Sequence, residues 1–347
     1  MPRAWSSMEA VSHPALALPH RFLGMIGDVP AFSVRSVALT TVCAGAGVLG
    51  YSTLIEPRAF ALRRCDVPVL PPQAPPVKIL HVTDLHLTPS QQYRANWLSG
   101  LDILEPDLVI STGDNLAHMD AVPAVLEAYG PLLHRPGVFV LGSNDYFPPV
   151  LKNPFGYFGQ SHRRGAALTR KRLPTQDLVD GFKAGGWLSV IHRRQRLTVA
   201  GVDLEIVGVN DPHIEMDHYD RVAGAAAADA DLTIGVTHAP YQRVLDPMVA
   251  DGAKLLIAGH THGGQVCVPG YGALVTNCDL DTKRAKGLTR WWAGAGDQDK
   301  RGQLSHETPD DAAYLHVSAG LGASPYSPFR LACRPEATLL TLRPRPT

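Results

Sequence analysis

The chain has 347 residues, of which 45% are hydrophobic and 18% are charged, so it can form a sizeable core and is not globally disordered. Its 32 basic and 32 acidic residues give a formal net charge of zero, and this balance provides no general attraction to nucleic acid. The five cysteines are scattered and never form a CxxC pair, so we predict neither a structural zinc module nor a disulfide framework.

A charge-free stretch near the start of the chain, Ser36 to Ile55, is long enough to span a bilayer as a helix. An export signal and a soluble helix are the alternatives, although the long leader before the stretch argues against a simple signal peptide. Arginines flank the stretch on both sides, so the positive-inside rule gives no orientation. We therefore expect a leader and a single-pass membrane anchor over residues 1–56, with the side of the membrane left open.

Residues 57–77 contain the proline-rich string DVPVLPPQAPP, which predicts a stiff linker into a globular domain over residues 78–347. In that domain, apolar runs alternate with helix-like segments, and each run resembles a strand buried on both faces. The runs are KILHVTD (78–84), DLVISTGDN (107–115), GVFVLGSND (137–145), DLTIGVTHAP (231–240) and KLLIAGHTH (254–262). This alternation predicts an α/β domain. Residues 186–209 instead show short alternating runs with a turn at AGVD, which predicts an antiparallel hairpin in a second sheet.

Every one of these runs carries Asp, His or Asn at or next to its carboxyl end. Asp84 and His86 are two positions apart, a spacing that puts both side chains on the same side of an extended chain. In open α/β sheets, ligands bind outside the carboxyl ends of the strands, so these side chains should line one crevice. Mixed carboxylate and imidazole ligands suit Mn, Fe or Zn better than Ca or Mg. The other run ends carry, in chain order, Asp114 with Asn115, Asn144 with Asp145, His238, and His260 with His262.

These motifs resemble those of the calcineurin-like metallophosphoesterases. The relevant strings are DLH (84–86), GDN (113–115), THAP (237–240) and GHTHGGQ (259–265). The strings LIEPRAF (54–60), HVTDLHL (81–87) and GLGASPYSPFRLACRPEATLLTL (320–342) are similar to the membrane-anchored bacterial branch of that family. The resemblance implies a four-layer αββα sandwich, preceded here by the anchor helix, and a site for two divalent metal ions.

The resemblance also implies a division of the ligands between two ions. Asp84, His86 and His262 would hold one ion. Asn144, His238 and His260 would hold the other, and Asp114 would bridge both. Gly263 and Gly264 would allow the backbone to approach closely.

The third block departs from the family pattern of Gly-Asn-His followed by Asp or Glu. This chain has Gly142-Ser143-Asn144-Asp145. Without a gap, Ser143 replaces the metal-binding Asn and Asn144 replaces the His that assists the leaving group. With a shift of one, Asn144 is the ligand and Asp145 replaces that His. We prefer Asn144 as the ligand, because a serine hydroxyl is a poor ligand for a divalent ion.

The leaving group therefore lacks its usual histidine, and Asp145, His118 and His213 are the candidates for a substitute proton donor. Catalysis would depend on Asp114, Asn144 and Asp145. General acid help is worth about 10²–10⁴-fold, so its loss favours substrates with good leaving groups. We expect a phosphodiesterase rather than an alkyl monoesterase, with a metal-bridging hydroxide as the nucleophile.

The expected partner is a phosphate-containing small molecule or a lipid-linked phosphate. A second hypothesis is a catalytically impaired, metal-binding sensor or scaffold for a phosphorylated ligand. A protein phosphatase is a third possibility.

Overall fold

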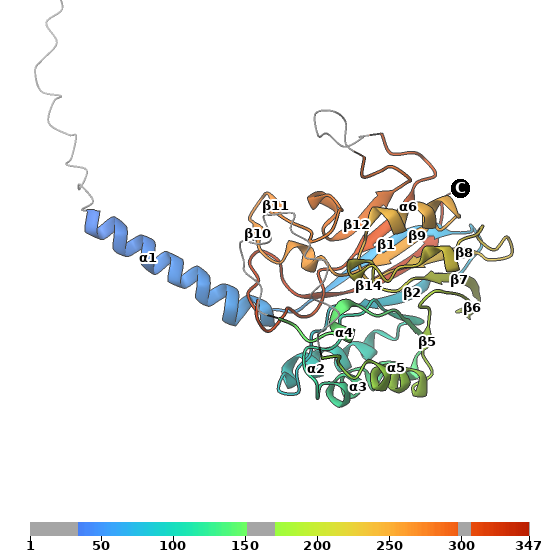
Figure 1. Ribbon diagram of the computed structural model, residues 1–347. Coiled ribbons are helices and arrows are strands. Elements are labelled where there is room, and N and C mark those ends of the chain that lie inside the picture. Colours follow the sequence, from blue (N-terminus) through green and yellow to red (C-terminus); the bar gives the residue numbers. More distant parts are fainter. Residues whose placement is uncertain (1–33, 151–170, 298–306, 347) are drawn as a thin grey trace, which may run out of the picture. The chain divides into compact units, whose positions relative to one another are not determined.

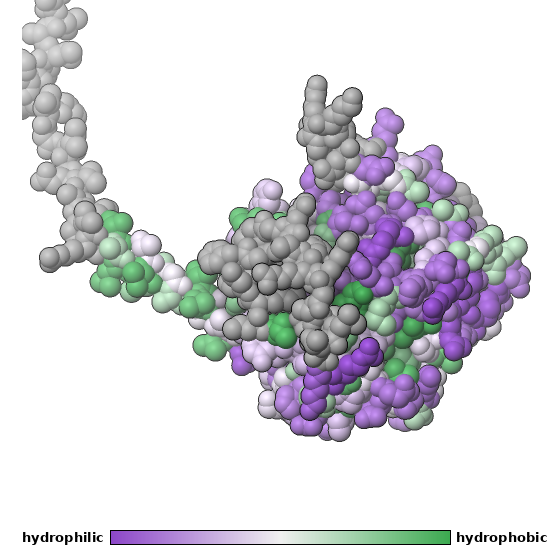
Figure 2. All heavy atoms as spheres, in the orientation of Figure 1, coloured by the Kyte–Doolittle hydropathy of each residue, from purple (hydrophilic) through white to green (hydrophobic). Residues whose placement is uncertain are grey.

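The computed structural model describes residues 34–150, 171–297 and 307–346, and the predicted leader up to residue 33 lies outside them. The chain divides into two compact units, residues 1–47 and 48–347. Helix α1 (Val34–Gly50) is followed by a π-helical turn, η1 (Tyr51–Ile55), and a 3-10 turn, η2 (Glu56–Arg58). The segment Ser36–Arg58 has a mean hydropathy of 1.5, and Figure 2 shows the hydrophobic residues along α1. By length and composition, this segment is a candidate membrane span.

The domain contains two six-stranded mixed sheets (Figure 1). The first has the order β1 (Ala61–Leu70), β14 (Glu336–Pro344), β2 (Val77–Val82), β3 (Leu108–Ser111), β4 (Gly137–Phe139) and β5 (Leu188–Ser189). The second has the order β12 (Gly287–Trp291), β13 (Ala313–Val317), β9 (Leu255–Ala258), β8 (Leu232–Val236), β7 (Val202–Gly208) and β6 (Arg193–Val199). A separate small hairpin joins β10 (Cys267–Val268) to β11 (Gly272–Ala273).

Helices cover the outer faces of both sheets. Figure 1 shows α2 (Gln92–Ser99), α3 (Val122–Tyr129) and α5 (Thr175–Ala184) together against the first sheet, and α6 (Gln242–Ala250) against the second. The buried side chains of α2, α3 and α5 share a core with β2, β3 and β4. Those of α6 share a core with β7, β9 and β13, and a third core fills the space between the sheets. The predicted four-layer αββα sandwich is therefore confirmed.

The remaining helical pieces are short. They are η3 (Gly100–Leu104), η4 (Leu132–His134), α4 (Ser143–Tyr146), η6 (Pro212–Ile214), η7 (Tyr219–Arg221), η8 (His262–Gly264) and η9 (Thr282–Arg284).

The five predicted apolar runs are strands β2, β3, β4, β8 and β9, and the predicted hairpin is β6–β7 with its turn at Ala200 and Gly201. The register of the parallel strands brings their carboxyl ends to one edge. Val82 pairs with Ser111, and Ser111 pairs with Phe139. The loops that follow β2, β3 and β4 therefore leave the first sheet side by side.

Residues 57–77, predicted to be a linker, contain strand β1, so the expected domain boundary is corrected. Strand β1 pairs in parallel with β14 along its length, and Val67 and Leu70 are fully buried. Pro68 is tolerated because β1 is the edge strand of its sheet, where a missing backbone donor breaks no inner ladder. Apolar residues that looked like part of a proline-rich linker thus belong to the core.

Candidate metal centre

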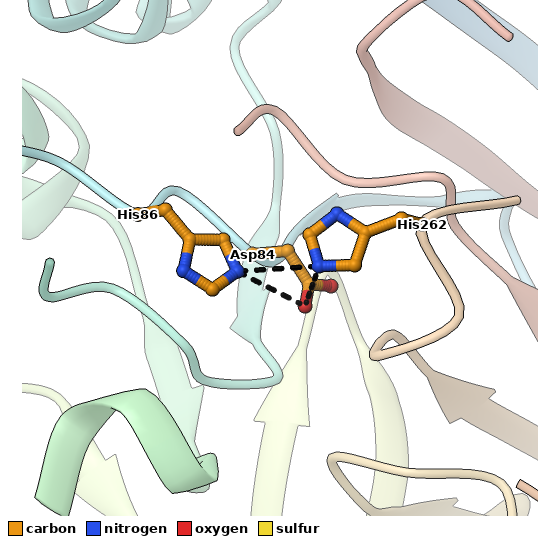
Figure 3. A group of neighbouring side chains, drawn as sticks. All are labelled: Asp84, His86 and His262. Carbon is orange, nitrogen blue, oxygen red and sulfur yellow. Dashed lines mark hydrogen bonds and ion pairs between the residues drawn. The ribbon is translucent and has the colours of Figure 1, made fainter. Parts of the chain in front are cut away.

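Three predicted ligands converge at the end of β2 and in the loop after β9 (Figure 3). The Nε2 atoms of His86 and His262 lie 3.2 Å apart. The carboxylate oxygen Oδ1 of Asp84 lies 3.5 Å from His262 Nε2 and 3.9 Å from His86 Nε2. Two imidazoles and one carboxylate therefore point their free atoms at one small volume, which is what a single divalent ion requires.

A second group joins Asp84 to Asp114 and His238, with its ligand atoms within 4.8 Å of one another. Asp114 Oδ2 lies 3.5 Å from His86 Nε2 and 3.6 Å from His238 Nε2. This carboxylate therefore stands between the two groups.

Asn144 and His260 border this second group. The Asn144 backbone N–H donates to Asp114 Oδ1, and its side-chain amide lies 2.7 Å from Asp114 Oδ2. The His260 ring centroid lies 5.2 Å from that of His238, but no His260 atom falls within either group of three. His260 Nε2 lies 3.2 Å from the carbonyl of Asn277, which leaves Nδ1 as the atom that could bind an ion.

The backbone at the ligands is strained in a consistent way. Asp84, His86, Asp114, His260 and His262 all have φ between 42° and 69°, which is the left-handed region that residues with a Cβ rarely adopt. Such outliers cluster at functional sites, where the surrounding fold holds them. Here the left-handed turn ends each strand and redirects the next side chain toward the shared edge.

Two of the histidines are held in the tautomer that a metal needs. His238 Nδ1 lies 2.7 Å from the carbonyl of Thr112, and His262 Nδ1 lies 3.1 Å from the carbonyl of Gly322. Because a carbonyl can only accept, Nδ1 carries the proton in the neutral form of each ring, and Nε2 then has the lone pair for an ion. Arg330 Nη2 also lies 3.4 Å from His262 Nδ1. Burial also lowers the pKa of His86 to about 4 and that of His262 well below its ordinary value, so both rings are neutral near pH 7.

The negative charge of the site is compensated only in part. Asp84, Asp114 and Asp211 are buried, and burial raises the pKa of Asp84 to about 6. Burial also favours the neutral form of Asp114, but His238, His86 and the Asn144 hydrogen bonds lower its pKa to about 2. Burial lowers the pKa of His238, yet the carboxylates raise it to about 9, so a proton on His238 balances part of the charge. A divalent ion would displace that proton and neutralise the carboxylates.

The residues present fit a pair of divalent ions. Asp84 Oδ1, His86 Nδ1 and His238 Nε2 are buried and lack a hydrogen-bond partner, a costly state that coordination would relieve at Asp84 and His238. The donor set is oxygen and imidazole nitrogen, which suits Mn, Fe or Zn.

Asp145, Asn144 and His118, whose roles the sequence left open, lie in different surroundings. The Asp145 carboxylate accepts hydrogen bonds from the backbone N–H groups of Asp114, Asn115 and Gly142 at 2.7–3.0 Å. It is fully buried and holds the two strand-end loops together, so its carboxylate is occupied by the backbone. Asn144, rather than Ser143, contacts Asp114. His118 is half exposed and pairs with Asp120 at the surface.

His213 lies beside the candidate ligand His260. Its ring centroid is 4.3 Å from that of His260, and its Nδ1 is 3.1 Å from the hydroxyl of Tyr241. It belongs to η6 in the NDPH loop after β7, where the Asp211 carboxylate accepts from its backbone N–H. Of the three predicted proton donors, only His213 packs its ring against that of a candidate ligand.

No separate sequence signal marks the residues that support the ligands. Arg330 is buried, and its Nη2 donates to the carbonyls of Ala319, at 2.8 Å, and Gly322, the second of which also accepts from His262. Both Arg330 and Gly322 fall inside the C-terminal string that resembles the family. The string identified residues 320–342 as similar to the family, but it did not predict these contacts.

Glycine at position 142 is required by the close approach of the ligands. A Cβ there would lie 2.3 Å from Asp114 Oδ1 and 2.6 Å from the His238 ring. We expect Gly142→Ala to weaken Mn²⁺ binding by about 10–100-fold, as displaced ligands do. Titration calorimetry of the metal-free chain in detergent measures this. Gly100→Ala is the control, because its Cβ meets nothing within 4 Å and its affinity should not change. Equal affinities for both variants would contradict the geometry.

The chain belongs to the calcineurin-like phosphoesterase family, whose pattern it matches over residues 77–264. Members of this superfamily are hydrolases that use divalent metals, and the Asp/His groups described above can bind them. The chain is 28% identical over 280 residues to the uncharacterized Bacillus subtilis protein YpbG, covering 77% of this chain and 82% of that protein. It is 24% identical over 319 residues to the uncharacterized B. subtilis metallophosphoesterase YkuE, covering 89% and 94%.

Solved structures show more distant similarity. A 5'-nucleotidase precursor from Thermus thermophilus aligns with a TM-score of 0.40 and 14% identity, covering 77% of this chain and 55% of that one. A purple acid phosphatase from yellow lupin aligns with a TM-score of 0.35 and 11% identity, covering 74% and 57%.

A bovine transmembrane protein with a metallophosphoesterase domain is a further relative by sequence. It is 21% identical over 263 residues, and the match covers 71% of this chain and 54% of that protein.

Proposed function

We propose that the protein is a membrane-anchored phosphoesterase that depends on two divalent ions and hydrolyses activated or diester-type phosphates. The observation that supports this most strongly is the convergence of His86, His262 and Asp84 on one point, with Asp114 between that point and His238. Two such ions would lower the pKa of a shared water, supply it as hydroxide and stabilise the phosphoryl oxygens.

The protein's own residues divide the remaining work. Asp84, His86 and His262 would hold one ion, and His238, His260 and Asn144 the other, with Asp114 shared. Asn144 also fixes Asp114 through two contacts of 2.7 Å. Asp145 positions the loops after β3 and β4 through backbone hydrogen bonds, so it acts through Asp114 and Asn144 rather than on the substrate.

His213 is the proposed proton donor to the leaving oxygen, because its ring packs against that of the candidate ligand His260. It would take the place of the histidine that residues 142–145 lack. Tyr241 contacts its Nδ1, so Nε2 is the atom that we expect to donate. We expect His213→Gln to slow hydrolysis of phenyl diesters by about 10²-fold but of p-nitrophenyl diesters by less than about tenfold, since a good leaving group needs little acid help. Steady-state kinetics on a series of aryl diesters tests this. His118→Gln serves as the exposed control, and an equal loss across the series would exclude the assignment.

Turnover on simple substrates tests the function itself. The full chain in detergent with Mn²⁺ should hydrolyse bis-p-nitrophenyl phosphate, and should act at least about 10²-fold more slowly on an alkyl monoester whose leaving group needs strong acid help. Comparable rates on both substrates would contradict the proposed preference.

A metal-binding sensor of a phosphorylated ligand is the second candidate, and the altered third block is the observation that favours it. Metal binding without any turnover in the same assay would support the sensor over the enzyme.

The segment Ser36–Arg58 supports single-pass membrane anchoring by its length and hydropathy. An anchored phosphoesterase would meet phosphates at the membrane, such as lipid-linked ones, as well as small phosphate-containing molecules.

A further inference from the structure

The small hairpin β10–β11 exposes apolar side chains. Tyr271 is 76% exposed, Leu274 46% and Val268 44%. Residues 263–278 contain no charged side chain, and Figure 1 shows β10 and β11 outside the two large sheets. An uncharged, apolar loop of this kind is unusual on a surface that faces only water.

A pocket of about 310 Å³ opens beside this hairpin, and we call it the hairpin pocket. The residues that matter for its chemistry are Val268, Tyr271 and Ala332 on the apolar part and Lys283 and Lys286 on the basic part. This combination is complementary to acyl-chain carbon next to a negatively charged headgroup. Gly263, which also lines the pocket, directly follows the candidate ligand His262.

The end of the candidate membrane span lies against the same segment of the domain. The carbonyl of Ser52 accepts from the Arg330 N–H at 2.8 Å, and the Glu56 carboxylate accepts from the N–H groups of Ala332 and Cys333. On its other side, this segment bridges the base of the hairpin, because the Cys267 N–H donates to the carbonyl of Leu331 at 2.8 Å.

The turn that ends the span also exposes apolar side chains. Leu54 and Ile55 are exposed, and Tyr51 is partly so. Residues 330–333 thus connect two exposed apolar elements, η1 and the hairpin. The two elements are fixed to each other within the domain, so a bilayer that receives residues 51–55 is close to the hairpin as well.

We propose that the hairpin, the hairpin pocket and η1 form a face that docks on anionic phospholipid, with the hairpin tip in the headgroup region and a lipid phosphate between Lys283 and Lys286. This inference rests on the membrane anchor proposed above. Each lysine near an anionic surface contributes attraction worth roughly a fivefold change in affinity. The docked face would hold the loop His262–Gly264 beside the membrane surface, where a lipid-linked phosphate is found.

Hydrogen–deuterium exchange of the full chain tests the face, in nanodiscs of phosphatidylcholine alone or with phosphatidylglycerol. Peptides from 266–275 and 282–287 should exchange at least about fivefold more slowly in the anionic discs. The double variant Lys283→Glu, Lys286→Glu should remove that difference, and Val268→Ser with Tyr271→Ser should reduce protection in both kinds of disc. Lys183→Glu, an exposed charge reversal on α5, is the control and should behave as the wild type.

Equal exchange of the hairpin peptides in neutral and anionic discs would overturn the proposal, as would protection that persists in the double glutamate variant. The anchor is read separately from peptides within residues 36–55 in the same samples. Fast exchange of the peptides within residues 36–55, together with slow exchange of the hairpin peptides, would refute the membrane anchor and still support the lipid-binding face. Hydrolysis of a soluble diester by the same samples reports on the phosphoesterase independently of both.

Discussion

Asp114→Asn is expected to lower turnover of bis-p-nitrophenyl phosphate by at least about 10³-fold and to reduce the bound metal from two ions to one. The Asp114 carboxylate is buried, and one oxygen lies within 3.6 Å of imidazole nitrogens from both ligand groups. The Asn amide has the same shape as the Asp carboxylate but carries no charge. One of its two polar atoms is an N–H donor, which cannot coordinate a metal ion. Atomic emission on the purified chain gives the metal content, and steady-state kinetics gives the turnover.

Asp120→Asn is the matched control for this variant. It makes the same chemical change six positions away in the same loop region, where the carboxylate is 83% exposed and pairs only with His118 among the described residues. Full activity in Asp120→Asn together with a loss in Asp114→Asn would assign the effect to the site. Retention of both ions and most activity in Asp114→Asn would refute the bridging role.

The ligand-bearing strand ends could be predicted from sequence because parallel strands impose a simple geometry. Each buried run stops at or near a polar residue, and parallel pairing brings the ends of β2, β3 and β4 to one edge of the first sheet and those of β8 and β9 to one edge of the second. The sequence pattern therefore predicts that Asp84 and Asp114 lie close together. The approach of His262 depends in addition on the packing of the second sheet against the first. The alternation of runs and helical segments predicted an α/β domain, whereas the four layers were implied by the resemblance to the family.

Features that depend on a single side-chain contact could not be predicted. Ligand chemistry favoured Asn144 over Ser143, but the contact itself is set by the short helix α4, which turns Asp145 back onto the backbone and Asn144 toward Asp114. The rotation of His260 depends on the carbonyl of Asn277, and no sequence period records that contact. Strand β1 was missed because its partner, β14, lies at the other end of the chain.

Arg330→Met is expected to destabilise the domain by about 3 kcal/mol or more, because the buried guanidinium satisfies several carbonyls at once and each buried polar group left unpaired costs about 1–3 kcal/mol. Its Nη1 lies 3.2 Å from the carbonyl of Cys333, and its Nη2 contacts the carbonyls of Ala319 and Gly322. The Gly322 carbonyl also accepts a hydrogen bond from His262 Nδ1. The loss of Arg330 should therefore displace this candidate metal ligand and weaken metal binding by about 10–100-fold.

Two measurements separate these effects. Urea unfolding of the metal-free chain gives the change in stability, and Mn²⁺ titration under conditions where the variant remains folded gives the change in affinity. Arg334→Met is the control, since Arg334 is exposed and the carbonyls it contacts, those of Ala59 and Phe60, can bond to water instead. Arg330→Lys should recover part of the stability but little of the affinity, because an ammonium group lacks the planar fork that reaches several carbonyls. A variant that loses stability but binds Mn²⁺ as the wild type does would limit Arg330 to a structural role, and His262 would then be oriented by Gly322 alone.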